Sequence, residues 1–303
     1  MSFKEGDEMQ KYLPNRGSGA VFILLIAFLY NALLIALLYL TNSYEIATIL
    51  RVALIALNIY QLYYLFICLS LYYVIENEEL KIISLWGIKK VKIPLNEIKG
   101  YKTFSGKIRG IRLSGYGRDF FAIGRSVIEK IGTTYMYVTS SKNILYIKTD
   151  EINYGLSPIE MEKVINNLKN NNICETSWDY KFGKSGTLFN DKKFAIPFMI
   201  STLIIGFITI NPVIQYLYQN IPAIMPLGFD AKFIPVNYGT GKQFAFKQMT
   251  HGLLNMAILL CMYYASYFIA KYDRKSAYKF ICVPLVLSII FLILQIRIFL
   301  TFR

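Results

Sequence analysis

Few side chains in this sequence have the types and spacing that catalysis or metal binding requires. His251 is the only histidine among the 303 residues, so neither a cluster of histidine ligands nor a histidine-based catalytic triad is available. The patterns GxxxxGK[ST], HExxH and GxSxG do not occur, and no carboxylate lies inside the long apolar segments. We therefore predict that the protein is not an enzyme, with no catalytic residue, no metal site and no cofactor.

The first group of residues able to bind a partner is a run of basic residues. Lys89, Lys90 and Lys92 lie with Val91 and Ile93 on a predicted strand that follows an apolar segment. They could contact anionic lipid headgroups, at about 1 kcal/mol per basic residue near the surface, or dock a protein partner. The alternative is a solvated strand face whose charge only satisfies the cytoplasmic preference for lysine and arginine.

The second group lies in a long segment between two apolar runs near the C-terminus. Asp230, Lys232, Lys242 and Lys247 occur there among aromatic residues and three prolines. Prolines reduce the entropy lost when a loop becomes ordered, and aromatic side chains suit the membrane interface. These four residues are candidates for contact with an extracytoplasmic ligand; the alternative is an interfacial lid whose charges satisfy one another.

The elements that must position these residues are five apolar segments, at 20–41, 52–75, 194–210, 252–270 and 280–302. Each is roughly long enough to cross a ~30 Å hydrocarbon core as a helix. The chain is 55% hydrophobic and 17% charged, whereas about 25% charged residues are usual in soluble proteins. The net charge of +14 is spread over loops and the polar insert, which excludes a concentrated nucleic-acid-binding face. We expect the lipid bilayer, and no nucleic acid, as a partner.

Basic residues in the short loops predict the orientation. The segment KYDRKSAYK at 271–279 carries four basic residues against Asp273, so it should be cytoplasmic. Counting crossings back from it places residues 1–19 and the polar insert in the cytoplasm. The loop 211–251 and the C-terminus then lie outside. We predict a multi-pass protein of the cell membrane, with Asn211 and Pro212 interrupting or bending the third span.

The insert at 76–173 has the pattern of a small β-rich domain closed by a helix. Strand-like runs occur at 80–86, 89–93, 99–104, 133–139 and 144–148. Ser157, Pro158 and Glu160 then match a capping box, and apolar residues follow at helical spacing from Met161 to Leu168. A linker at 174–193 leads to the remaining spans.

Two strings in this insert resemble bacterial pleckstrin-homology (PH) domains. The first is VIENEELKIISLWGIKKVKIPLNEIKGYK, and the second is YMYVTSSKNILYIKTDEINYGLSPIEMEKVINNLK. The resemblance implies a seven-stranded PH-like barrel with one end closed by the C-terminal helix. It also implies a binding or scaffolding role, through a protein partner or self-association.

A second resemblance lies in the C-terminal half. The segments IPAIMPLGFD at 221–230 and YGTGK at 238–242 resemble the N-terminal membrane region of SdpI-type bacteriocin-immunity and signalling proteins. Gly228 occupies the histidine position of that family, and AKFIPVN replaces its usual glycine–acid pair. The resemblance implies a compact extracytoplasmic loop held between two helices.

Together these features predict an α-helical membrane protein of about five spans with an inserted PH-like domain. We expect a non-enzymatic protein that couples an extracytoplasmic loop to the cytoplasmic domain, in bacteriocin or membrane-stress immunity or in signalling. The alternative is a transporter or channel subunit in which the PH-like domain is regulatory.

Overall fold

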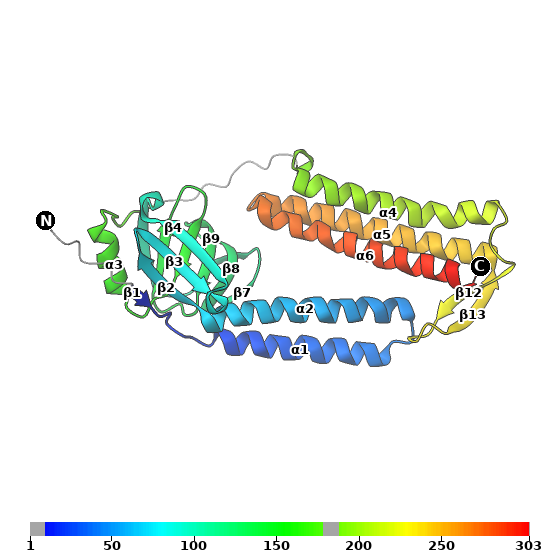
Figure 1. Cartoon of the computed structure of the whole chain (residues 1–303), viewed down its shortest axis with the longest axis horizontal. Helices are drawn as coiled ribbons and strands as arrows, with labels where there is room; N and C mark the ends of the chain where they lie inside the picture. The colour runs from blue at the N-terminus through cyan, green and yellow to red at the C-terminus, as the bar shows by residue number, and fades with distance from the viewer. Residues whose placement is uncertain (1–9, 178–187, 303) are drawn as a thin grey trace. The chain divides into compact units, whose positions relative to one another are not determined.

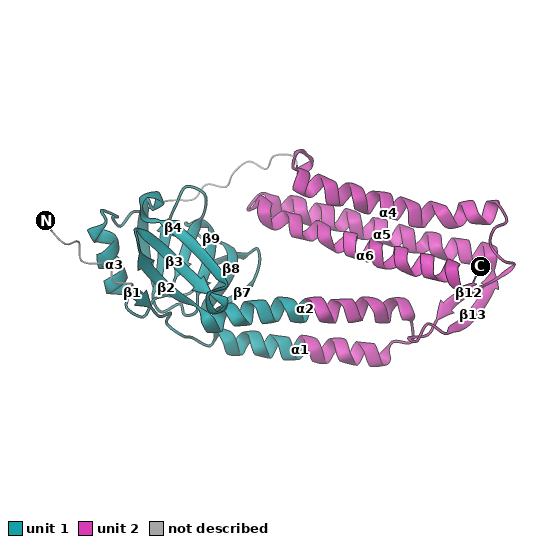
Figure 2. Cartoon of the chain, in the orientation of Figure 1, with its two compact units in different colours: residues 1–29, 57–182 teal, residues 30–56, 183–303 magenta. Residues whose placement is uncertain are grey.

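The computed structural model describes residues 10–177 and 188–302 (Figure 1). The chain folds into two compact units, one of residues 1–29 and 57–182 and the other of residues 30–56 and 183–303 (Figure 2). Both division points near the N-terminus fall inside helices, so α1 (Gly19–Leu40) and α2 (Tyr44–Ser70) each contribute to both units.

Among the described residues, five helices are long and apolar enough to span a membrane: α1, α2, α4 (Lys192–Leu217), α5 (Gly241–Ala270) and α6 (Arg274–Phe302). They contain 22 to 30 residues, which is about 33–45 Å at 1.5 Å per residue. Their number and order confirm the prediction from the sequence. Their bounds differ from it, because α2 begins earlier, at Tyr44, and α5 begins at Gly241, before the apolar run itself.

A proline inside α4 is accommodated by a neighbouring helix of the same unit. Pro212 has no N–H, so the carbonyl of Ile208, four residues earlier, loses its helical partner. The side chain of Gln295 on α6, which is buried, donates a hydrogen bond of 2.9 Å to that oxygen. This compensation explains why α4 continues through Pro212 to Leu217 instead of ending at the predicted interruption.

Two capping signals turned out differently from the sequence prediction. The capping box predicted at Ser157–Glu160 is wrong: α3 (Met161–Asn170) has Glu160 as its N-cap residue, without a side-chain cap. Ser157 is instead buried, and its hydroxyl accepts a hydrogen bond from the Thr139 amide. A capping box that the sequence analysis missed starts α5, where Thr240 and Gln243 bond to each other's backbone amides.

In the part of the chain that the structure describes, the β-rich unit contains two sheets. One has the order β1–β2–β3–β4 and the other the order β5–β10–β11–β9–β8–β6, with β7 also paired to β8. Among the described strands no ladder joins the two sheets, so a closed seven-stranded barrel is not seen. The strands are β1 (Gln10–Tyr12), β2 (Tyr72–Glu76), β3 (Glu79–Ser84), β4 (Lys89–Pro94), β5 (Gly100–Phe104), β6 (Gly110–Arg112), β7 (Tyr116–Arg118), β8 (Phe121–Ile128), β9 (Gly132–Val138), β10 (Ile144–Lys148) and β11 (Asn153–Leu156).

The core of this unit combines side chains of both sheets with the apolar face of α3. Leu80 and Ile82 of one sheet, Leu145 of the other, and Leu168 of α3 are all fully buried in it. The five strand-like runs of the sequence correspond to β3, β4, β5, β9 and β10. The strand β8 was missed, because its eight residues are buried on both faces and show no alternation.

In the other unit, α4, α5 and α6 pack with a two-stranded hairpin, β12 (Ile224–Phe229) and β13 (Pro235–Thr240). Gly252 of α5 lies against Thr209 of α4, at a position where a Cβ atom would collide with the threonine side chain. Phe244 of α5 and Met225 of β12 are fully buried in a cluster that also contains Ile298 of α6. The hairpin is therefore a folded part of this unit.

Candidate functional site: the contacts of helix α2

The candidate site is centred on α2, which runs from Tyr44 to Ser70 without a break. Residues 44–56 of this helix belong to the unit that contains the hairpin, and residues 57–70 belong to the β-rich unit. The helix therefore makes one set of contacts in each unit.

In the β-rich unit, tyrosines of α2 contact the turn before β7. The hydroxyl of Tyr60 accepts a hydrogen bond of 2.7 Å from the amide of Gly115. The ring of Tyr116 lies 5.8 Å from that of Tyr60 and 5.9 Å from that of Tyr64, measured between centroids. Aromatic pairs at such distances contribute about 0.5–1.5 kcal/mol beyond their burial, so this turn is well anchored to the helix.

The end of α2 leads almost directly into the first sheet. Only Leu71, which is buried, separates Ser70 from the first residue of β2. The hydroxyl of the buried residue Tyr73 donates to the carbonyl of Tyr137 at 2.7 Å and accepts from the amide of Ser157 at 3.1 Å. Burial raises the pKa of Tyr73, so the phenol stays neutral and keeps both bonds. The connection is short and firmly held.

A strained turn lies beside the last turn of α2. Leu85 and Trp86 have φ values of 54° and 52°, a left-handed conformation that costs energy in residues with side chains. The amide of Leu85 donates to the hydroxyl of Ser70 at 2.6 Å, and the Trp86 ring lies 5.4 Å from that of Phe66. The turn leaves Trp86 69% exposed and Ile88 86% exposed. It therefore presents two large apolar side chains next to the end of an apolar helix.

The three lysines predicted to bind lipid or a partner follow this turn on β4, but they do not form one patch. Lys89 donates to the hydroxyl of Tyr63 on α2 at 2.8 Å. Lys90 and Lys92 lie on the opposite face of the strand and are exposed, with Lys92 3.8 Å from the carboxylate of Glu79. Lys89 thus belongs to the contact with α2, and Lys90 is the lysine left available to an external anion.

In the other unit, the hairpin is held against the start of α2. Arg297 of α6 donates to the hydroxyl of Tyr44 at 2.6 Å, and its guanidinium lies 4.0 Å from the centroid of Phe233. Phe233 stacks on Phe229 at 4.5 Å. Arg51 of α2 donates to the carbonyl of Ala231 at 3.4 Å. These roles were not predicted from the sequence. The signal for one of them is an arginine, Arg297, near the end of an apolar helix.

The four residues predicted for the outer loop have different surroundings. Asp230 accepts hydrogen bonds from the amides of Lys232 and Ile234, both at 2.8 Å, and so holds the hairpin turn. Lys247 lies in α5, donates to the carbonyl of Leu227 and is 3.9 Å from Glu45 of α2.

The side chains of Lys232 and Lys242 are exposed, and Lys242 lies at the start of α5, outside the loop. Within residues 10–177 and 188–302, no group of three or more His, Cys, Asp or Glu side chains is placed to hold a metal ion.

Comparison with known proteins identifies one part of this arrangement. Residues 71–172, which follow α2 and include the strands β2 to β11 and α3, match the family described as bacterial PH domain. This confirms the PH-domain resemblance, whereas the SdpI-type resemblance stays a prediction. No solved structure matches the chain.

A relative from Clostridium acetobutylicum, described as an uncharacterized protein, is 37% identical over 294 residues. The aligned region covers 97% of this chain and 99% of the relative, so the similarity extends over both the apolar helices and the inserted domain of this chain. The chain therefore belongs to the same family as this Clostridium acetobutylicum protein, and it carries a bacterial PH domain.

Proposed function

We propose that this protein crosses the cell membrane five times and couples an extracytoplasmic hairpin to a cytoplasmic PH domain through α2, without acting as an enzyme. The observation that carries the proposal is that α2 is one unbroken helix with contacts at both ends. Tyr44 and Arg51 contact the hairpin. Tyr60, Phe66 and Ser70 contact the PH domain. A helix is stiff along its axis, so a shift at one end reaches the other.

The basic connection between α5 and α6 supports this orientation. Lys271, Arg274, Lys275 and Lys279 lie in or beside it, which favours the cytoplasm for this end of both helices. The hairpin, at the other end of α5, is then extracytoplasmic. Five crossings place the PH domain in the cytoplasm and the C-terminus outside.

The hairpin has the surface expected of a sensor for a membrane-active agent. Ile224 is 70% exposed, and Val236 and Tyr238 are each 60% exposed. Lys232 adds a positive charge near the hairpin turn. An amphiphilic peptide that binds at the membrane surface would meet these side chains first. We place the protein in immunity or signalling against such agents, which is also what the SdpI-type resemblance implies.

Contact between the PH domain and lipid forms part of the same proposal. The turn with Trp86 and Ile88 lies beside the last turn of α2, where that helix would leave the hydrocarbon core. Tryptophan is enriched at this depth of the membrane, and Lys90 lies two residues after Ile88 to meet an anionic headgroup. The PH domain is then held at the cytoplasmic surface by α2 and by this turn together.

A genetic experiment tests the proposed role. We expect deletion of the gene to increase sensitivity to at least one agent in a panel of membrane-active peptides, and the wild-type gene to restore resistance. The variant Arg297→Gln, which loosens the hairpin, should restore it poorly, whereas Lys193→Gln, which removes an exposed charge from the first turn of α4, should restore it fully. Unchanged sensitivity of the deletion strain across the whole panel would contradict immunity.

A further inference from the structure

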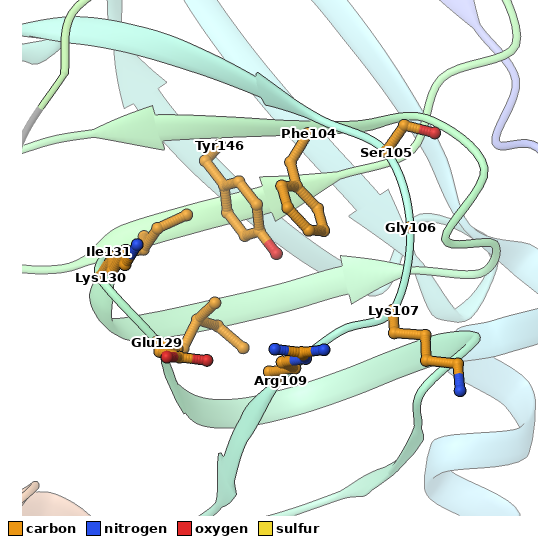
Figure 3. Close-up of a pocket in the computed structure, with 10 residues that line it drawn as sticks. Phe104, Ser105, Gly106, Lys107, Arg109, Glu129, Lys130, Ile131 and Tyr146 are labelled. Atoms are coloured by element: carbon orange, nitrogen blue, oxygen red, sulfur yellow. The ribbon is translucent and has the colours of Figure 1, made fainter.

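The outer side of the larger sheet of the PH domain contains a cavity of about 350 Å³ (Figure 3). The loop between β5 and β6 and the turn between β8 and β9 form its rim, and Tyr146 of β10 lies at its base. Its volume is at the lower end of the ~300–1,000 Å³ found for small-molecule sites. None of the contacts of α2 described above uses this surface.

The cavity has an apolar wall and one buried hydroxyl group. Phe104 and Ile131 line it beside the ring of Tyr146. Tyr146 is only 1% exposed, and its hydroxyl points into the cavity (Figure 3). Among the described residues, nothing makes a hydrogen bond to this hydroxyl. Burial raises the pKa of Tyr146, which keeps the phenol protonated and able to donate.

Positive charge exceeds negative charge around the opening. Lys107, Arg109 and Lys130 line the cavity against one carboxylate, that of Glu129. In the described parts of the chain, no carboxylate oxygen lies within 4.0 Å of these three cations. Arg109 lies across the cavity from the Tyr146 hydroxyl (Figure 3). Lys130 has a φ of 62°, a left-handed conformation that is common in the short turns of hairpins.

The backbone holds the rim in place, so the cavity does not depend on a ligand to form. The amide of Gly106 donates to the carbonyl of Ser141 at 3.1 Å, and that of Ile108 donates to Asp119 at 2.8 Å. The amide of Glu129 donates to the carbonyl of Arg109 at 3.1 Å, which ties the two sides of the rim together. A preformed site loses less entropy when it binds.

We propose that this cavity binds a small amphiphilic anion, a carboxylate or phosphate carried on a compact apolar group. The anionic group would accept hydrogen bonds from Arg109 and the Tyr146 hydroxyl, with Lys107 and Lys130 adding charge. The apolar group would lie against Phe104 and Ile131. Such a ligand can be a soluble metabolite or the phosphate end of a lipid, since both present the same chemistry.

The test is direct binding to the full-length protein in nanodiscs of zwitterionic lipid. Phenyl phosphate serves as the probe. Inorganic phosphate supplies its anionic half alone, and phenol supplies its apolar half alone. We expect saturable binding of phenyl phosphate by calorimetry, about tenfold tighter than that of either half. The variants Arg109→Gln and Tyr146→Phe should each weaken it about tenfold. Lys169→Gln, which removes an exposed charge from α3, should bind like the wild type.

Two results would overturn the proposal: no saturable binding of phenyl phosphate, or wild-type affinity in both cavity variants. Arg109 is exposed, so its variant decides the matter even if Tyr146→Phe does not fold. Adding phosphatidic acid to the nanodiscs separates the two sources of ligand. If phosphatidic acid weakens the binding of phenyl phosphate, the proposal is supported with a lipid as the ligand. If the affinity for phenyl phosphate is unchanged, the proposal is supported with a soluble ligand.

Discussion

The guanidinium of Arg297 lies 4.0 Å from the ring centroid of Phe233. Phe233 follows the first strand of the hairpin, and Arg297 is near the end of the last helix. The same guanidinium donates a hydrogen bond to Tyr44, in the first turn of α2. One arginine therefore holds together three elements that are remote in sequence, and the proposed transmission through α2 begins at this contact.

The first prediction concerns this arginine. Replacing Arg297 with glutamine removes the cation–π contact, which contributes about 0.5–1 kcal/mol at an exposed site, and the hydrogen bond to Tyr44. We expect faster hydrogen–deuterium exchange in residues 224–240 and in the first turns of α2. Lys242→Gln provides a control with the same loss of charge. Equal exchange in wild type and Arg297→Gln would show that the arginine does not hold the hairpin.

The second prediction concerns the proline in α4. Gln295→Leu leaves the carbonyl of Ile208 without a partner in a buried place, at a cost of about 1–3 kcal/mol in the free energy of unfolding. Pro212→Ala restores a backbone N–H that can bond to the same carbonyl. Gln295→Leu should therefore cost less in the Pro212→Ala background than in the wild type. Thermal unfolding of all four proteins in detergent measures this difference, and equal costs would refute the compensation.

The third prediction concerns how deeply the exposed turn with Trp86 and Ile88 lies in the membrane. Trp86 and Trp178 are the two tryptophans of the chain, so Trp178→Phe leaves Trp86 as the only one. We expect brominated lipids to quench its fluorescence in proteoliposomes, most strongly when the bromine lies near the headgroups. Quenching should fall when anionic lipid is replaced by zwitterionic lipid or when Lys90 is changed to glutamate. A tryptophan quenched only by an aqueous quencher would contradict contact with the membrane.

The fourth prediction concerns alkaline pH. Burial raises the pKa values of Tyr73, Tyr137 and Tyr146 above the ordinary value of 10.0, so above about pH 10 these tyrosines ionise more readily in the unfolded chain than in the folded one. The unfolded state then binds fewer protons, and stability falls as the pH rises. We expect the thermal stability of the PH domain to be constant near neutral pH and to decrease steeply above about pH 10.

A matched variant checks the cause. Tyr73→Phe cannot ionise, so it should lose stability at neutral pH, because its two hydrogen bonds are missing. It should also show a smaller further decrease at high pH than the wild type. An identical alkaline decrease in both proteins would mean that Tyr73 does not contribute to it.

Local patterns in the sequence were sufficient for much of the fold. The five helices follow from uninterrupted apolar runs, because the hydrocarbon length sets how many residues a span needs. The strands β3, β4, β9 and β10 follow from alternation and flanking turn residues. The helix α3 follows from its apolar spacing. Its predicted start was wrong, because the hydroxyl of Ser157 bonds to Thr139 and the residue's amide bonds to Tyr73, both remote in sequence.

The candidate site was predictable only in part. The sequence marked Asp230 and Lys247 as residues of interest, but their roles came from folding: one holds a turn, and the other lies near Glu45. The three lysines of β4 were found, but side chains alternate along a strand, so Lys89 lies on the face opposite to Lys90 and Lys92. Lys89 then bonds to Tyr63 of the nearby helix. Composition alone could not decide which of these lysines stays available to an external anion.

The sequence by itself determined the class of this protein, because hydrophobicity, span length and strand alternation act over neighbouring residues. Only the tertiary structure decided which distant residues lie together. Arg297 and Tyr44 are 253 residues apart, and Arg109 and Tyr146 line one cavity although they lie on separate segments of the domain. Such pairings depend on how sheets and helices pack, which no local pattern records. The physical reason is that they form through packing across the whole unit and leave no periodic signal in the chain.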